Sequence, residues 1–182
     1  MLKNDFLKLI PGAVLCDVPD DILDVLQVYF NKLTLTRPNI TEGKYKQWFI
    51  QHALHGNHLR DDDTNFTVWQ DYGKLDKFKE FFLQFVNGIY RFRYCSMPAN
   101  HLIDYHRPHL YPRIHIPLND SKSFFTIDTP DKTFEFTLEK GKAYILNVVW
   151  PHTVKCDLYR EHCFFSFSDF ATNDLKSKYW LD

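Results

Sequence analysis

Two histidine–arginine pairs in the second half of the chain combine residue types that suit a metal ion and an acid. The first pair is His106 with Arg113, followed by His115, and the second is His152 with Arg160. Neutral imidazole is a ligand for iron and other first-row metals, and a guanidinium fork matches a carboxylate. Because each pair lies beside a β-rich segment, we expect one inward-facing site that binds a metal and a carboxylate-bearing co-substrate.

Short alternating segments predict that strands position these side chains. Apolar and polar residues alternate after residue 90, and turn residues such as Asn119-Asp120 and Lys140-Gly141-Lys142 separate the segments. About seven short strands at nearly regular spacing are typical of a sandwich or a barrel. The expected strands are 91–96, 113–118, 123–128, 133–138, 143–148, 153–156 and 163–170.

The first half of the chain has helical periodicity instead. Apolar residues at helical spacing follow Asp20 and Asp21 and predict a helix over residues 22–30, and a stripe of phenylalanines predicts another over residues 75–90. For residues 43–73 we expect one short helix at about 44–54 and irregular loops. Helices followed by strands indicate an α+β protein in which the helices buttress one sheet.

Length and composition indicate one folded domain with no nucleic-acid or membrane partner. The 182 residues carry 22 basic and 23 acidic side chains, for a net charge of −1, whereas a nucleic-acid binder has a basic face. No apolar run approaches the roughly 20 residues of a membrane span. The four cysteines lack paired short spacing, so free thiols in a cytoplasmic protein are the simplest account, with two disulfides as the alternative. No oligomeric state is indicated.

Five motifs occur in order along residues 95–170. They are the turn at Asn100 before Ile103-Asp104-Tyr105-His106, then Arg113-Ile114-His115-Ile116-Pro117-Leu118, then Gly141 with Leu146-Asn147, then Pro151-His152-Thr153-Val154, and finally Arg160. In this order they resemble the core of the aspartyl/asparaginyl β-hydroxylase branch of the iron(II)/2-oxoglutarate-dependent oxygenases. The resemblance covers under half of the chain.

The resemblance implies a fold, a reaction and a site. The fold would be a double-stranded β-helix (a cupin-like jelly roll) over residues 95–182, with residues 1–94 packed on one sheet and supplying a substrate lid. The enzyme would use Fe(II), 2-oxoglutarate and O2 to hydroxylate an amino-acid side chain, free or in a peptide. His106 and His152 would be the metal-binding and catalytic residues, and the co-substrate contacts would be Arg160, Arg113, His115 and Ser96. Candidate substrate contacts are Trp48, Trp69 and Asn147.

One departure from the wider superfamily leaves alternatives open. Pro108 occupies the position of the usual carboxylate ligand, which implies iron completed by water, halide binding, or inactivity. Asp104 could replace the carboxylate, and His109 could replace His106 as the first ligand. The same core could also serve as a natural-product halogenase or modifying oxygenase. A non-catalytic binding module is the remaining hypothesis, with a zinc site drawn from Cys95, His101, His106, His109 and His115.

Overall fold

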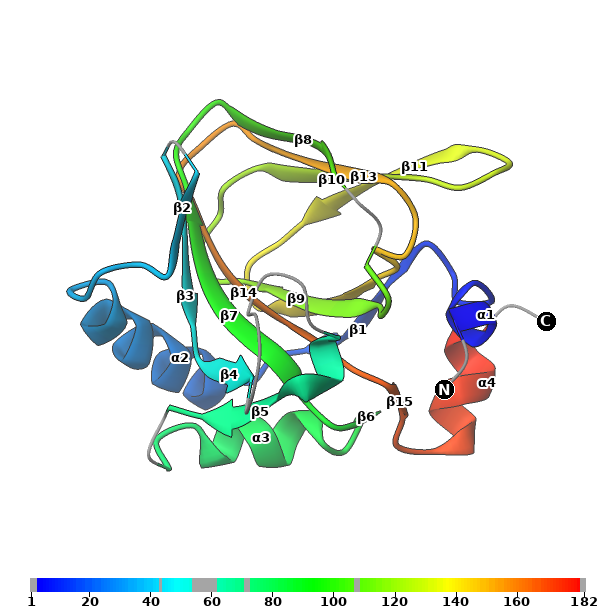
Figure 1. Cartoon of the computed structure of the whole chain (residues 1–182), viewed down its shortest axis with the longest axis horizontal. Helices are drawn as coiled ribbons and strands as arrows, with labels where there is room; N and C mark the ends of the chain where they lie inside the picture. The colour runs from blue at the N-terminus through cyan, green and yellow to red at the C-terminus, as the bar shows by residue number, and fades with distance from the viewer. Residues whose placement is uncertain (1–2, 43, 54–61, 71–72, 107–108, 181–182) are drawn as a thin grey trace.

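Two facing β-sheets dominate the computed structural model, which describes residues 3–42, 44–53, 62–70, 73–106 and 109–180 (Figure 1). The seven-stranded sheet has the order β1 (Gly12–Asp17), β12 (Lys142–Leu146), β9 (Arg113–Pro117), β14 (Arg160–Ser166), β7 (Tyr90–Met97), β3 (Tyr45–Phe49) and β2 (Ile40–Glu42). The four-stranded sheet has the order β11 (Thr133–Leu138), β10 (Ser123–Asp128), β13 (His152–Cys156) and β8 (His101–His106).

The connectivity of β7 to β14 makes these sheets a double-stranded β-helix. Strands β7, β9, β12 and β14 lie in the larger sheet, and β8, β10, β11 and β13 form the smaller one. All the pairings are antiparallel, as in a jelly roll. The predicted fold class is therefore confirmed, and the predicted strands 123–128 and 133–138 match β10 and β11 residue for residue.

Alternation along the strands divides the buried side chains between two cores. Cys95 and Met97 of β7 belong to the cluster between the sheets, whereas Phe92 and Tyr94 belong to the core outside the larger sheet. Because side chains alternate along a strand, one face of β7 meets the barrel interior and the other meets the helices. The barrel interior thus receives residues 93, 95 and 97 of β7.

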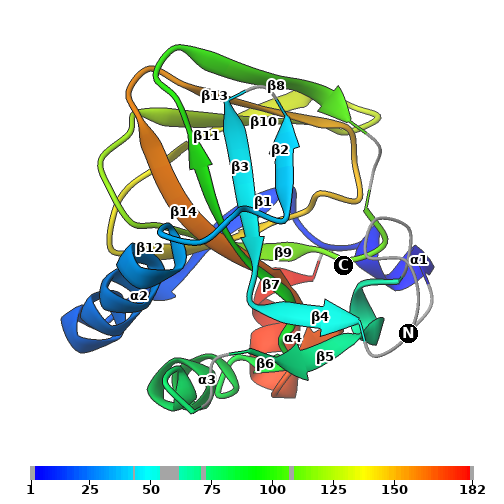
Figure 2. The same ribbon diagram turned by 60° about the vertical axis from the view of Figure 1, so that its left-hand side comes forward.

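Helices α2 (Asp20–Leu33) and α3 (Asp76–Phe82) lie against the larger sheet, on the side away from the smaller one (Figures 1 and 2). Phe30 of α2 stacks on Tyr94 with 4.3 Å between ring centroids, and Phe78 of α3 stacks on Phe92 at 4.6 Å. This confirms the first predicted helix and the packing of helices on one sheet. Within the described residues, no helix is both long and apolar enough to span a bilayer.

The second predicted helix, over residues 75–90, is wrong beyond Phe82. The chain leaves the helix at Leu83, and Val86–Asn87 forms strand β6, which pairs with β15 (Asp169–Phe170). Gly88 then takes a positive φ of 82°, a conformation that suits glycine and breaks the helical path. Phe85, the last phenylalanine of the predicted stripe, therefore lies beyond the end of the helix at Phe82.

The predicted helix at about 44–54 is also wrong, because this segment forms strands. Tyr45–Phe49 is β3, and Lys46 pairs with Ser96 at the edge of β7. A hairpin of β4 (Gln51–Ala53) with β5 (Phe66–Trp69) follows, with a 3-10 turn, η1 (Asp63–Asn65), before β5. Hydrogen bonding to an open sheet edge decides this conformation, and a local sequence window does not contain that partner.

The first 94 residues contribute strands as well as helices. They supply β1, β2 and β3 to the larger sheet, and β7 begins at Tyr90. The short helices α1 (Lys3–Phe6) and α4 (Asn173–Tyr179) lie beside each other at one end of the molecule (Figure 1). The four cysteines are free thiols.

Candidate functional site

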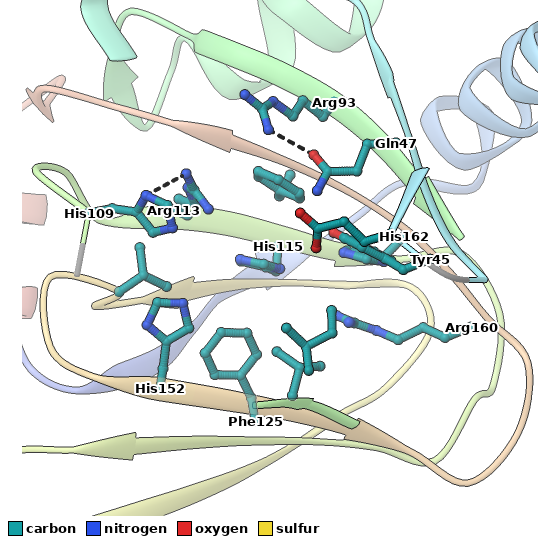
Figure 3. A pocket seen from close by; sticks show the side chains of 15 residues that line it. Tyr45, Gln47, Arg93, His109, Arg113, His115, Phe125, His152, Arg160 and His162 are labelled. Carbon is teal, nitrogen blue, oxygen red and sulfur yellow. Dashed lines mark hydrogen bonds between the residues drawn. The ribbon is translucent and has the colours of Figure 1, made fainter. Parts of the chain in front are cut away.

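A cavity of about 210 Å³ lies between the two sheets, inside the barrel (Figure 3). Both sheets line it, and the larger sheet contributes through β2 and β3 from the first half of the chain as well as through β7, β9 and β14. Its lining residues are Glu42, Tyr45, Gln47, Arg93, Ile103, His109, Arg113, His115, Phe125, Val148, His152, Val154, Arg160, His162 and Phe164.

His152 begins β13 and presents its imidazole to this cavity in the form that binds metals. Its side chain is 1% exposed, and Nδ1 donates a hydrogen bond to the Trp150 carbonyl at 2.9 Å. Because Nδ1 carries the proton, Nε2 is the nitrogen with the ligand lone pair. Phe125 stacks on the ring with 5.4 Å between centroids, which fixes its plane.

His106 ends β8 directly opposite His152 in the β13–β8 ladder. The two predicted metal ligands therefore occupy paired positions on neighbouring strands, although the side chain of His106 lies outside the described residues, as do residues 107–108, which include Pro108. Asp104, the possible replacement carboxylate, is exposed and is not among the cavity-lining residues.

His109 lines the cavity next to His152, with 5.7 Å between the ring centroids. Its Nδ1 lies 3.0 Å from Nη2 of Arg113. A guanidinium only donates hydrogen bonds, so Nδ1 of His109 must accept and Nε2 carries the proton. In this arrangement Nδ1 of His109 is occupied by Arg113 and Nε2 carries a proton, so the ring does not have the form of a metal ligand.

Arg160 begins β14 and places a buried guanidinium in the cavity. The residue is 1% exposed, and its Nη1 lies 3.9 Å from the Met97 sulfur. Nε and Nη2 have no hydrogen-bond partner among the described residues. Burial lowers the pKa of Arg160, but a guanidinium remains charged at neutral pH. A buried cation with two unused donors is a ready site for the carboxylate of a ligand.

Tyr45 and His162 lie beside Arg160 and were missed by the reasoning from sequence. Burial, followed by the charge of Arg160 and by His115, holds the pKa of His162 well below its usual range, so this ring is neutral. Burial raises the pKa of Tyr45, so its hydroxyl stays protonated. His162 could have been predicted, because it lies two residues after Arg160 on one strand and so faces the same side of the sheet. The sequence around Tyr45 contains no comparable pattern.

A buried ion-pair network holds Arg113 from behind the cavity. Asp63 of η1 bonds to Arg91 and to the Ser166 hydroxyl, and it lies 3.7 Å from Nη2 of Arg113. Burial opposes ionisation of Asp63, but Arg113, Arg91 and the hydrogen bonds outweigh it and lower the pKa of the carboxyl. Arg113 also lines the cavity, but its guanidinium is already engaged by Asp63, Ser166 and His109.

His115 lies on the same face of β9 as Arg113 and lines the middle of the cavity. Its ring packs with two others, at 5.1 Å from Phe164 and 5.8 Å from His162, and those two rings lie 5.8 Å from each other. The structure thus brings five of the sequence-predicted positions to one region: Arg113, His115, His152 and Arg160 by their side chains, and His106 by its place in the ladder.

Four other predicted contacts do not line the cavity. Ser96 lies on the face of β7 that alternates with Cys95 and Met97, and Trp48 packs in the outer core against Tyr94. Trp69 packs against the outer core, and Asn147 donates hydrogen bonds to the carbonyls of Phe6 and Leu9. The cavity contacts instead come from their neighbours, including Gln47 and Val148.

The strand geometry argues against a zinc site that uses both His101 and His106. His101 and His106 are the two ends of β8, about 16 Å apart at the usual rise of a strand, so they cannot share one ion. In the described part of the chain, no three His, Cys, Asp or Glu side chains are grouped as a metal site.

Several solved structures of similar architecture are oxygenases. One is an oxidoreductase of the 2OG-Fe(II) oxygenase family from Burkholderia pseudomallei, with a TM-score of 0.58 and 14% identity over 92% of this chain and 90% of that one. A prolyl-4-hydroxylase from Pseudomonas putida has a TM-score of 0.57 and 11% identity over 92% and 96% of the two chains.

A third similar structure is a prolyl hydroxylase from Trichoplax adhaerens in complex with a peptide fragment of the hypoxia inducible factor oxygen degradation domain. Its TM-score is 0.59, with 11% identity over 97% of this chain and 91% of that one. No family model and no curated protein matches the sequence. At these identities the likeness shows architecture alone: the chain has the double-stranded β-helix fold found in 2OG-Fe(II) oxygenases.

Proposed function

We propose that this protein is an iron(II)/2-oxoglutarate-dependent oxygenase that hydroxylates an amino-acid side chain, free or in a peptide. One observation carries the proposal. A metal-competent histidine, His152, and a buried guanidinium with unused donors, Arg160, line the same cavity of a fold that 2OG-Fe(II) oxygenases share.

The residues present fit an iron(II) ion. His152 offers Nε2, and His106, opposite it in the ladder, is the proposed second ligand. With proline at position 108, water would complete the coordination, which leaves positions open for a chelating 2-oxo acid. Bound iron would supply the centre at which O2 is activated. His109 lies beside His152 at this end of the cavity and is bonded through Nδ1 to Arg113.

Arg160 is the proposed anchor for the distal carboxylate of 2-oxoglutarate. Its two unpartnered donors, Nε and Nη2, suit a two-pronged contact with a carboxylate. The protonated hydroxyl of Tyr45 is a further donor in the same cavity. We propose Arg160 rather than Arg113 as the anchor because Arg113 is already bound to Asp63, Ser166 and His109.

Residues 1–94 are proposed to contact the substrate. They supply Glu42, Tyr45, Gln47 and Arg93 to the cavity wall, whereas Trp48 and Trp69 face the outer core. The Trichoplax adhaerens enzyme with its bound peptide supports a side chain in a peptide as one form of the substrate.

An anaerobic titration tests the proposal. Iron(II) and 2-oxoglutarate added to the metal-free protein should produce the weak visible charge-transfer band of a 2-oxo acid chelated to iron. His152→Ala should remove the band and lower iron affinity while the far-UV circular dichroism stays unchanged. Tightly bound zinc with no band in the wild-type protein would contradict the proposal and favour a binding module.

A further inference from the structure

Arg93 is a third buried guanidinium in the cavity, beside Arg113 and Arg160, and lies on the wall opposite His152 (Figure 3). The residue is 5% exposed, and its Nη1 donates to Oε1 of Gln47 at 2.7 Å. Its Nε and Nη2 have no hydrogen-bond partner among the described residues. The ring of Phe49 lies 4.0 Å from the guanidinium carbon, which fixes the plane of the group and leaves its donor edge for another contact.

Positive charge exceeds negative charge around this cavity. Arg93, Arg113 and Arg160 line it against one lining carboxylate, Glu42, and the buried carboxylate behind it, Asp63, forms ion pairs with Arg91 and Arg113. No ion pair to Arg93 exists within the described residues. Burial, with the nearby charges of Arg91 and Arg113, lowers the pKa of Arg93 to about 9, so it remains a cation at neutral pH. A buried cation without an ion-pair partner is unfavourable unless a ligand supplies one.

The co-substrate does not account for Arg93. In the β14–β7 ladder Arg160 lies opposite Met97, whereas Arg93 lies opposite Phe164. The two arginines are therefore four residues apart along the ladder, about 13 Å at the usual strand rise. With one carboxylate of 2-oxoglutarate at Arg160 and the other at the metal, Arg93 is left to meet a different anion.

We propose that Arg93, held by Gln47, binds a carboxylate of the primary substrate, which is therefore an acid. This inference rests on the proposed function and specifies its substrate class. The planar guanidinium edge suits a planar carboxylate, and the amide nitrogen of Gln47 adds a donor beside it. The carboxylate belongs either to an acidic side chain or to the free α-carboxyl group of an amino acid.

Paired probes test the substrate class by binding alone. Isothermal titration would use the full chain with Mn(II) and saturating 2-oxoglutarate. Aspartate would be compared with asparagine, which lacks the side-chain carboxylate, and with aspartic acid α-amide, which lacks the α-carboxylate; glutamate would be compared with its two matching amides. Removing the carboxylate that Arg93 binds should weaken binding ten-fold or more. A loss with the side-chain amide assigns the side-chain carboxylate, and a loss with the α-amide assigns the α-carboxylate. Equal binding of each acid and both of its amides would overturn the proposal.

Variants locate the preference at Arg93. Arg93→Gln should abolish it and leave the Kd for 2-oxoglutarate unchanged, whereas Arg93→Lys should retain part of it. If Arg93→Gln instead weakens 2-oxoglutarate binding, Arg93 is a co-substrate anchor and the inference is wrong. If the wild-type protein binds no 2-oxoglutarate, the proposed function fails first and this inference fails with it.

Arg91→Gln is a matched control two residues away on the same strand. Arg91 is paired with Asp63, so its loss should lower the Tm of the ligand-free protein. Arg93→Gln should leave that Tm unchanged or raise it, because it removes an unpaired buried charge. An equal fall in Tm for both variants would show that Arg93 is structural and would overturn the proposal.

Discussion

Replacing Arg160 with methionine should separate co-substrate binding from folding. The side chain is 1% exposed, and two of its three guanidinium nitrogens have no hydrogen-bond partner within the described structure. Its Nη1 contacts the Met97 sulfur at 3.9 Å. Methionine keeps most of the buried volume and removes the charge and the donors. The ligand-free protein therefore loses little, while the proposed complex with 2-oxoglutarate loses its anchor.

The size of the effect follows from the two unused donors. A hydrogen bond to a charged group contributes about 1.5–3 kcal/mol, so two such bonds to a carboxylate contribute about 3–5 kcal/mol after losses in geometry. At roughly 1.4 kcal/mol per factor of ten, the Kd should rise about a hundred-fold to several thousand-fold. Replacing an unpaired buried charge with an apolar group is neutral or favourable for folding, so Tm should not fall.

The assay is calorimetric titration of 2-oxoglutarate into the Mn(II)-loaded protein, with Tm of the ligand-free protein measured in parallel. Mn(II) affinity should be unchanged, because Arg160 is not a proposed ligand. Arg160→Lys is the matched variant, since it keeps the charge and loses the planar fork, and its Kd should lie between the other two.

Two results would refute this reasoning. An unchanged Kd for 2-oxoglutarate in Arg160→Met would mean that the co-substrate carboxylate binds elsewhere, with Arg113 and Arg93 as the remaining cavity guanidiniums. A fall of several degrees in the Tm of the ligand-free protein would mean that Arg160 stabilises the fold; for a chain of this size 1 kcal/mol corresponds to about 2–4 °C.

Three further predictions concern the surroundings of the site. Asp63→Asn should destabilise the protein by about 3–5 kcal/mol in urea unfolding, because Arg91 and Arg113 lose their buried partner; a loss below 1 kcal/mol would contradict the network. The folded state holds the pKa of His162 well below its usual range, so below about pH 6.5 the unfolded state binds a proton that the folded state does not. The free energy of unfolding should therefore decrease as the pH is lowered through this range, by up to about 1.4 kcal/mol per pH unit. His162→Gln should flatten that part of the Tm–pH profile, and an unaltered profile would rule out this residue as the cause. Asn147→Ala should cost about 1–3 kcal/mol by leaving the Phe6 and Leu9 carbonyls without their donor, with an unchanged Kd for 2-oxoglutarate; a weakened Kd would restore Asn147 to the site.

Elements with local signals were predictable from the sequence. Strands β10 and β11 form a hairpin whose alternation and turn at Pro130-Asp131 lie within one short window, and both were predicted to the residue. Helix α2 was predicted from its apolar stripe and acidic first turn. In contrast, β3 is a strand because it pairs with β7, about fifty residues away, as Lys46 opposite Ser96 shows. A long-range hydrogen-bond partner of this kind leaves no local pattern.

The alternation of side chains along each strand decided which residues reach the cavity. Arg113 with His115 and Arg160 with His162 alternate correctly on their strands, so their common face follows from spacing once the strands are known. Ser96 was expected at the site, but a shift of one residue along β7 moves a side chain to the other face, and the inward positions are those of Arg93, Cys95 and Met97.

The sequence alone determined the chemistry at hand: two widely spaced histidines, an arginine after each, and a strand-rich second half. Those features depend on residue types and short-range spacing, which are visible in one dimension. Only the tertiary structure decided that Tyr45, Gln47 and Arg93 line the same cavity as His152. They meet there because β3 and β7 are neighbours in one sheet whose inner face looks across the barrel, an arrangement set by strand pairing between distant segments.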